Sequence, residues 1–265
     1  MAAALPILFL SHGSPMHAIQ PGAVRAVWEG IARDLPRPKA ILIASAHWET
    51  NIPAVTGTAN PETIHDFYGF PKPLYEIQYP AKGSPELARR SLELLGNSGL
   101  KAEADPVRGL DHGAWSPLLH MYPKADIPVV QVAVQTPLGP RHHVELGRAL
   151  APLAAEGVLI IGSGHMTHNL RERGSNGPAP YAREFQAWVK EKIDAKDVDS
   201  LVNYRELNPH GVRAHPTDEH FLPLFVALGA ARKDCKTERL YAGIDRKSTR
   251  LNSSHIQKSR MPSSA

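Results

Sequence analysis

Histidines stand where several apolar runs of this sequence end. His12 follows ILFL and one serine, His47 follows ILIASA, and His165 and His168 follow VLIIGSG. In open α/β sheets, ligands collect outside the carboxyl ends of the strands. If each run forms a strand of one sheet, these side chains meet at one edge. The sequence therefore predicts an imidazole-rich site at that edge.

Such a site is suited to metal chemistry. Neutral imidazole binds Zn, Fe, Cu and Ni, and three protein ligands with open positions mark a catalytic metal site. His12 lies in HGSP, where Gly13 permits an unusual backbone angle, and His220 lies in HPTDEHFLPLF near the start of an expected helix. A structural zinc site is not expected, because Cys235 is the single cysteine and the usual thiolates are missing.

The elements that must position these histidines alternate between short β-rich runs and helical stretches, which favours a sheet covered by helices. The expected strands are Ile7–Ser11, Ala40–Ala46, Pro53–Thr56, Pro128–Ala133, Val158–Gly162 and Thr237–Ala242. The expected helices are Gly22–Asp34, Pro85–Asn97, Arg141–Ala155, Ala182–Lys192 and Asp218–Ala230. No repeat and no Gly/Ser linker divides them. We expect a single α/β domain with a central mixed, largely parallel sheet flanked by helices.

The composition is that of an ordinary globular protein, with 42% apolar and 21% charged residues. One cysteine excludes an intramolecular disulfide and fits a reducing cytosol. No window approaches the roughly 18 apolar residues needed to span a bilayer. We therefore expect a cytoplasmic protein with no membrane partner.

The net charge of +4 belongs to the end of the chain. Residues 246–265 contain five basic residues, six serines and no acid, which leaves 25 basic against 26 acidic residues in the rest. A neutral body gives no reason to expect a nucleic-acid partner. The composition of 246–265 cannot bury a core, so we expect a catalytic domain over 1–245 followed by a non-native or disordered basic tail.

Six segments, in this order, resemble the DODA-type (4,5-DOPA-like) extradiol ring-cleavage dioxygenases, a branch of the class III extradiol enzymes. They are SHGSP, SAHW, TIHDFYGFP, LDHGAWSPLLHMYP, GSGHMTHNL and PTDEHFLPL. HGS alone is a weak signal that small metal chelatases share, whereas the ordered set is specific. The likeness extends from about Leu8 to Gly243.

The resemblance implies that His12, His47 and His220 bind one divalent metal, either Fe(II) for dioxygenase activity or Zn(II) as bound. Class III relatives outside this branch commonly use two histidines and a glutamate. Here the third ligand matches His220, so Glu219 is not expected to bind the metal.

The resemblance also implies that His168 and His112 line the substrate pocket. Histidine is suited to taking the catechol proton and to assisting oxygen–oxygen cleavage, because its reference pKa is roughly 6.5. We expect His168 to be the acid/base and His112 to steady a substrate or oxygen atom. His65, Tyr68 and His165 are expected to contribute further substrate contacts.

For each of three residues, two roles stay open. Asp111 either orients the segment that carries His112 or simply caps the turn that follows. His165 and His215 stand where many members of this branch have asparagine, and each is either a second base near the pocket or an ordinary polar residue.

The expected function is oxygen-dependent extradiol cleavage of a catechol-type substrate by a monomer or homodimer. Three alternatives stay open at this stage. The same histidines would let a zinc hydrolase activate water, HGS is compatible with a chelatase, and the Memo-like proteins of this fold suggest a non-enzymatic binding module.

Overall fold

The computed structural model describes residues 4–172, 179–232 and 235–244, together with the backbone of 251–258. Its strands form one eight-stranded sheet in the order β4-β3-β5-β2-β6-β1-β8-β7. The strands are β1 (Ile7–Ser11), β2 (Ala40–Glu49), β3 (Ala54–Thr56), β4 (Glu103–Asp105), β5 (Val129–Val134), β6 (Val158–Gly164), β7 (Lys236–Ile244) and β8 (Leu251–Lys258). The four central strands β5, β2, β6 and β1 are parallel, whereas β3 on β5 and β8 on β1 are antiparallel. The sheet is therefore mixed and largely parallel, as expected.

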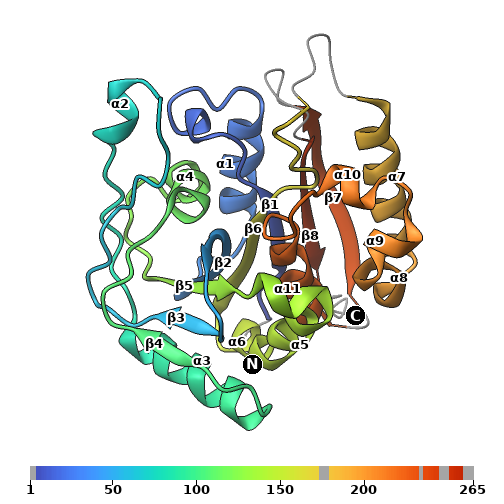
Figure 1. Ribbon diagram of the computed structural model, residues 1–265. Coiled ribbons are helices and arrows are strands. Elements are labelled where there is room, and N and C mark those ends of the chain that lie inside the picture. The colour runs from blue at the N-terminus through green and yellow to red at the C-terminus, as the bar shows by residue number, and fades with distance from the viewer. Residues whose placement is uncertain (1–3, 173–178, 233–234, 245–250, 259–265) are drawn as a thin grey trace, which may run out of the picture.

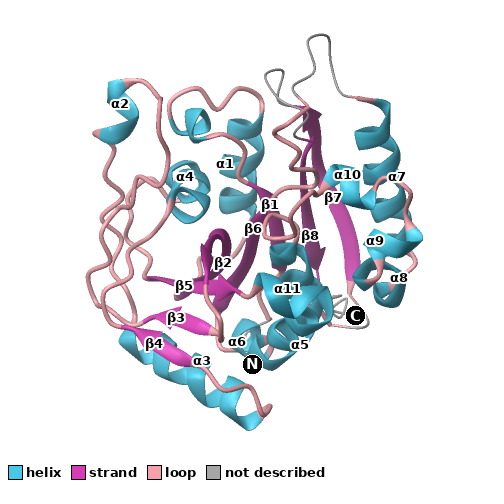
Figure 2. Ribbon diagram, in the orientation of Figure 1, coloured by secondary structure: helices cyan, strands magenta, loops and turns pink. Residues whose placement is uncertain are grey.

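Helices cover both faces of this sheet (Figures 1 and 2). Those of eight residues or more are α1 (Val24–Asp34), α3 (Pro85–Asn97), α4 (His112–Met121), α5 (Gly139–Leu150), α7 (Pro180–Asp194) and α11 (Leu222–Ala230). The shorter ones are α2 (Lys72–Tyr75), α6 (Pro152–Ala155), α8 (Val198–Val202), α9 (Tyr204–Leu207) and α10 (Gly211–Ala214). The expectation of a single α/β domain is confirmed.

The alternation of side chains along the strands builds two cores. In β1, Phe9 belongs to the core under α3, α5, α7 and α11, whereas Leu8 and Leu10 belong to the core under α1 and α4. The same period of two runs through β2, where Leu42 and Ile43 enter opposite cores. Both faces are covered, which explains why these strands are continuous apolar runs.

Most elements lie where the periodicity predicts them, and the differences are at proline-containing segments. The helix expected over Arg141–Ala155 is divided into α5 and α6 at Pro152. The helix expected over Asp218–Ala230 begins only at Leu222, so His220 lies in the turn before α11 rather than in its first turn. α4 was not expected, although Asp111 caps it through the amide of Ala114.

Strand β8 lies inside the segment that we expected outside the fold. It pairs antiparallel with β1, with Leu8 opposite Ile256, and with β7, with Thr237 opposite Gln257. Residues 251–258 are therefore part of the sheet in this structure. The non-native origin of 246–265 stays a prediction.

Candidate metal centre

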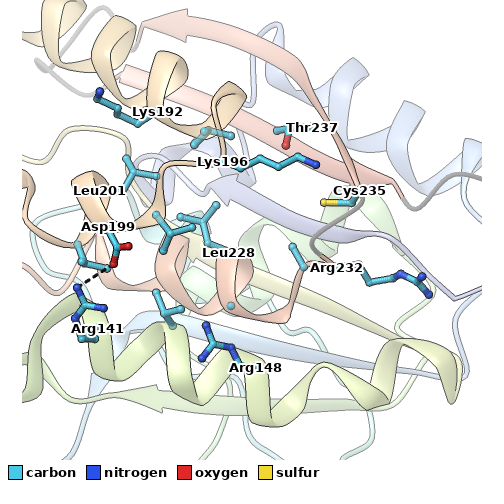
Figure 3. Close-up of a pocket in the computed structure, with 16 residues that line it drawn as sticks. Arg141, Arg148, Lys192, Lys196, Asp199, Leu201, Leu228, Arg232, Cys235 and Thr237 are labelled. Carbon is cyan, nitrogen blue, oxygen red and sulfur yellow. Dashed lines mark hydrogen bonds and ion pairs between the residues drawn. The ribbon is translucent and has the colours of Figure 1, made fainter.

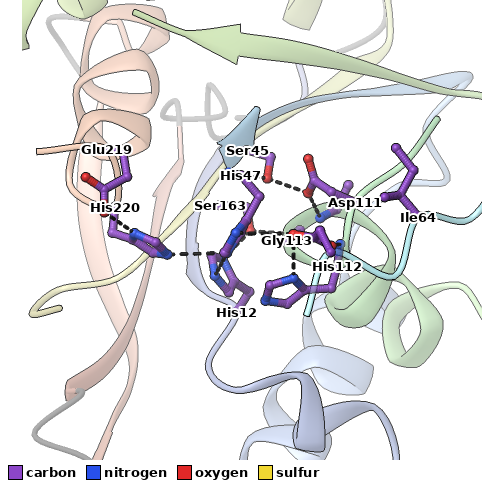
Figure 4. Close-up of polar contacts among 12 residues, drawn as sticks. His12, Ser45, His47, Ile64, Asp111, His112, Gly113, Ser163, Glu219 and His220 are labelled. Atoms are coloured by element: carbon purple, nitrogen blue, oxygen red, sulfur yellow. Dashed lines mark hydrogen bonds and ion pairs between the residues drawn. The ribbon is translucent and has the colours of Figure 1, made fainter. Parts of the chain in front are cut away.

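Six histidines from five places in the chain gather at the carboxyl edge of the parallel strands. Figure 4 shows His12, His47, His112 and His220 among them. They are His12 after β1, His47 near the end of β2, His112 at the start of α4, His165 and His168 after β6, and His220 before α11. The ring of His12 lies 4.9 Å from that of His47 and 5.7 Å from that of His220, centroid to centroid. The edge site predicted from the sequence is thus present.

The Nε2 atoms of three imidazoles converge. Nε2 of His47 lies 3.0 Å from Nε2 of His12 and 3.3 Å from Nε2 of His220. Two nitrogens that each lie about 2.0–2.1 Å from one ion, at octahedral or tetrahedral angles, are separated by about 2.9–3.4 Å. The observed separations therefore match those of ligands that share one divalent metal.

The opposite nitrogen of His12 is oriented by a serine. Nδ1 of His12 lies 3.0 Å from Oγ of Ser163, and Ser163 uses its own proton to donate to the carbonyl of Gly113. Oγ must then accept a proton from Nδ1. This tautomer leaves the lone pair of His12 on Nε2, where a metal would bind.

Carboxylates orient the other two converging imidazoles. Nδ1 of His47 faces Oδ2 of Asp66 at 3.3 Å, and Nδ1 of His220 lies 2.8 Å from Oε1 of Glu219. A carboxylate accepts a proton from Nδ1 and thereby directs the Nε2 lone pair inward. The lone pair of His47 Nε2 thus lies within 3.3 Å of Nε2 of His12 and Nε2 of His220, an arrangement that fits a bound cation.

Glycines allow α4 to approach β2 closely and the His220 turn to approach β6 closely. A Cβ at position 113 would lie 2.4 Å from Ser45 Oγ and 3.1 Å from Cδ2 of His47, so α4 reaches His47 only with glycine there. A Cβ at position 164 would lie 2.3 Å from the carbonyl of His220. Glycine at this end of β6 therefore permits the His220 turn to pack on the strand.

The charges of the site favour neutral imidazoles and ionised carboxylates. Burial, followed by the neighbouring histidines His112, His220 and His12, lowers the pKa of His47 well below its ordinary value. Burial acts to raise the pKa of Glu219, but the contacts with His168 and His220 outweigh it and lower that pKa strongly. Neutral nitrogen donors beside negative carboxylates form a suitable environment for a divalent cation.

Overlapping groups of side chains at this edge have ligand atoms within 4.8 Å of one another. They are His12, His47 and His112; His12, His165 and His220; and His168, Glu219 and His220. The predicted ligands are therefore brought together with the predicted pocket histidines. Which of them bind the metal stays a prediction.

His168 and His112 each pack against one of the converging imidazoles. The ring of His168 stacks on that of His220 at 3.4 Å, and its Nδ1 lies 3.7 Å from Glu219. The ring of His112 lies 4.0 Å from that of His47, and its Nδ1 lies 2.9 Å from Asp66. Asp66 thus contacts both His47 and His112.

His165 is fully buried beside the cluster, with its ring 4.4 Å from that of His12. Its amide donates to the carbonyl of His220 at 2.7 Å. His215 is farther from the converging nitrogens. It donates through Nε2 to the carbonyl of Met166, stacks on Phe221, and burial lowers its pKa to about 3.

Two of the expected substrate contacts lie elsewhere. Nε2 of His65 donates to the carbonyl of Ile77, and its ring packs against Phe67, which separates it from His112. The side chain of Tyr68 is 91% exposed, whereas that of its neighbour Phe67 is buried. In this structure Phe67, rather than His65 or Tyr68, contacts the histidine cluster.

Two residues that contact the cluster, Asp66 and Ser163, were not identified from the sequence. Asp66 follows His65 in IHDFYG, and the predicted contact was assigned to His65, one residue away. Ser163 lies in GSG, which resembles an ordinary strand end. An acidic residue between a histidine and aromatic residues was the one available clue.

A separate cavity of about 520 Å³ lies among α5, α7, α8, α11 and β7 (Figure 3). Its rim carries basic side chains, including Arg141, which pairs with Asp199 at 3.1 Å, and its floor is apolar. None of the clustered histidines lines it. We therefore place the chemistry at the histidine cluster, where bases and ligand atoms converge, rather than at this cavity.

Comparison with known proteins agrees with the geometry. Residues 6–251 match the family described as the catalytic LigB subunit of aromatic ring-opening dioxygenase. The chain belongs to this family. The expected resemblance to extradiol dioxygenases is confirmed.

Relatives within the LigB family are similar over most of their length. The 4,5-DOPA dioxygenase extradiol of Beta vulgaris is 47% identical over 243 residues, which cover 89% of this chain and 91% of that protein. The protein of the same name from Escherichia coli K12 is 42% identical over 232 residues, covering 85% of each. The crystal structure of an uncharacterized protein from Escherichia coli K12 matches with a TM-score of 0.81 and 37% identity, over 95% of this chain and 99% of that one.

This LigB-family chain is therefore an extradiol aromatic ring-opening dioxygenase. That result disfavours the chelatase, hydrolase and adaptor alternatives. Among the residues that the structure describes, no helix is long and apolar enough to cross a membrane.

Proposed function

We propose that this dioxygenase cleaves a catechol-type substrate with O2, using one divalent metal held by Nε2 of His12, His47 and His220. The observation that carries the proposal is the separation of these nitrogens by 3.0 and 3.3 Å, with each Nδ1 facing an oxygen acceptor. Lone pairs that face one another at this distance repel unless a cation lies between them. One chain is expected to bind one metal.

Fe(II) is the proposed metal for dioxygenase activity, and Zn(II) is the alternative for the metal as bound. Fe(II) would supply the redox chemistry that couples a closed-shell catechol to triplet oxygen. Three neutral imidazoles leave the site with the full charge of the ion, which favours an anionic catecholate.

His168 is the proposed acid/base. Its ring lies directly on His220, and Glu219 faces its Nδ1, which leaves Nε2 as the nitrogen to exchange a proton with a substrate hydroxyl. Glu219 would stabilise the imidazolium form after His168 accepts that proton. His112, held by Asp66 at 2.9 Å, is the proposed group that steadies a substrate or oxygen atom.

The first substrate to test is DOPA (3,4-dihydroxyphenylalanine), because the similar proteins from Beta vulgaris and Escherichia coli are named 4,5-DOPA dioxygenase extradiol. Protocatechuate and simple catechols are the comparison substrates. His165 remains a proposed substrate contact, whereas the observed positions of His65 and Tyr68 give less support to theirs. A cytoplasmic monomer or homodimer stays the expected form.

The experiment is anaerobic reconstitution with Fe(II), followed by oxygen uptake over the catechol panel, with Zn(II)-loaded protein as the comparison. We expect uptake of one O2 per ring opened, a yellow product and activity with iron alone. Correctly folded, iron-loaded protein that consumes no oxygen with any member of the panel would contradict the proposed substrate class.

A further inference from the structure

The backbone of His47 lies where regular strand pairing is interrupted. Pairing of β2 with β5 is regular as far as Ala44 and resumes at Glu49 after a register shift, while pairing with β6 extends as far as Ser45. An irregularity of this kind turns a side chain to a new direction but removes ladder partners from the backbone. The polar backbone groups of His47 must therefore be satisfied by side chains.

Both of these groups are bound by partners of one buried carboxylate, Asp111. The amide of His47 donates to Ser45 Oγ at 3.2 Å, and Ser45 Oγ donates to Oδ1 of Asp111 at 2.6 Å. The carbonyl of His47 accepts from Nη2 of Arg108 at 3.1 Å, and the same nitrogen lies 3.1 Å from Oδ2 of Asp111. Asp111 is thus linked to both the amide and the carbonyl of His47, through Ser45 and through Arg108.

Asp111 is itself held rigidly and also starts the helix that carries His112. Its side chain is fully buried and accepts from the amide of Ala114, which caps α4. Nε2 of Gln131 donates to its carboxylate, and its own amide donates to Gln131 Oε1 at 3.3 Å. Gln131 belongs to β5, so the carboxylate is anchored to the sheet.

We infer that Asp111, with Ser45 and Arg108, forms a positioning unit that sets where the His47 imidazole stands relative to His12 and His112. The unit touches no reacting atom. It replaces the ladder contacts that the strand irregularity removes, and it fixes both the β2 end and the α4 start through one carboxylate. The inference rests on the proposed metal site, because its consequence is metal affinity.

Ser45→Ala and Arg108→Lys test it through metal binding. Removal of such an orienting partner typically lowers metal affinity about 10–100-fold. We expect each variant to bind Co(II) about 10–100-fold more weakly in a competition titration, with a changed visible Co(II) spectrum. Arg90→Lys is the matched control, because Arg90 makes a similar two-pronged contact with Glu156 on the surface and is expected to bind Co(II) as the unchanged protein does.

A double-mutant cycle with His47→Gln separates positioning from general loss of packing. If Ser45 acts through His47, Ser45→Ala lowers Co(II) affinity in the parent but adds little to the weaker Co(II) binding of the His47→Gln background, which is titrated with excess Co(II). Equal losses in both backgrounds would overturn the inference. So would unchanged affinity and spectrum in folded Ser45→Ala and Arg108→Lys proteins.

Failure of the proposed metal site gives a different result. If the parent protein itself binds no Co(II), the proposed ligand set fails. If the parent binds tightly and both variants bind as tightly, the ligand set stands and the positioning role of Asp111 fails.

Discussion

Nδ1 of His220 lies 2.8 Å from a carboxylate oxygen of Glu219, the residue that precedes it. Adjacent residues rarely face each other in a helix, and the turn before α11 makes this contact possible. The same oxygen lies 3.7 Å from Nδ1 of His168. One carboxylate therefore serves a predicted ligand and the predicted acid/base together.

Glu219→Gln should affect both histidines. An amide keeps the shape but accepts less strongly from Nδ1, so we expect metal affinity to fall about 10-fold or more. Turnover of fully loaded protein should also fall, because the His168 imidazolium loses its counter-charge. Titration with a competing chelator and saturating-metal kinetics measure the two effects. Unaltered values in both measurements would contradict the shared role.

His12→Ala and His220→Ala should each abolish stoichiometric metal binding, since two imidazoles bind a divalent ion far more weakly than three. Metal analysis after dialysis measures the content. His210→Ala is the matched control, because His210 pairs with Glu184 on the surface at 2.7 Å and is expected to leave the content unchanged. Full metal content in both test variants would show the ligand assignment to be wrong.

His168→Ala should keep the metal and lose turnover. General acid–base groups typically contribute about 10²–10⁴-fold, and we expect a loss of kcat in that range. Oxygen uptake at saturating substrate, compared with the His210→Ala protein, measures it. A His168→Ala protein with undiminished kcat would remove this residue from the acid/base role.

Gly113→Ala should disturb the site by steric overlap alone. A Cβ there would come within 2.4 Å of Ser45 Oγ, and relief of such overlap typically costs about 1–3 kcal/mol. We expect a lower free energy of unfolding and weaker metal binding. Gly96→Ala in α3 is the control, since a Cβ there meets nothing within 4 Å and a helical alanine is favoured by up to about 1 kcal/mol. Equal stabilities of the two variants would contradict the close-packing explanation.

Protonation of His143 should lower the free energy of unfolding in mild acid. Burial lowers its pKa to about 4, Nδ1 donates to the carbonyl of Gly139, and Nε2 accepts from the amide of Gln135. The unfolded chain, with a pKa near 6.5, binds the proton first, so stability is full above about pH 6.5 and falls toward pH 4. We expect this residue to account for about 2 kcal/mol of the loss between pH 7.5 and pH 5.

Urea unfolding of metal-free protein at the two pH values, compared with His143→Asn, measures this contribution. Asparagine cannot gain a proton in this range, so the variant should lose less stability on acidification. An equal pH dependence in both proteins would assign the acid sensitivity to other groups.

Local patterns were sufficient to predict the central sheet. The runs around Leu8, Leu42 and Ile160 were placed correctly because burial on both faces produces continuous apolar segments. α4 was missed since its ten residues are almost all buried and carry an internal Pro117, so they lack the one-sided pattern of a surface helix.

The sequence by itself determined that imidazoles would gather, because parallel strands place their carboxyl ends at one edge and His12, His47 and His165 stand at the ends of three such apolar runs. Tertiary structure alone decided what orients them. Ser163 lies 151 residues from His12, and no local pattern encodes that contact. Likewise, the loop before α2 has no period to predict which way its side chains point, so packing decided that Phe67 and Asp66 face the cluster while Tyr68 faces solvent.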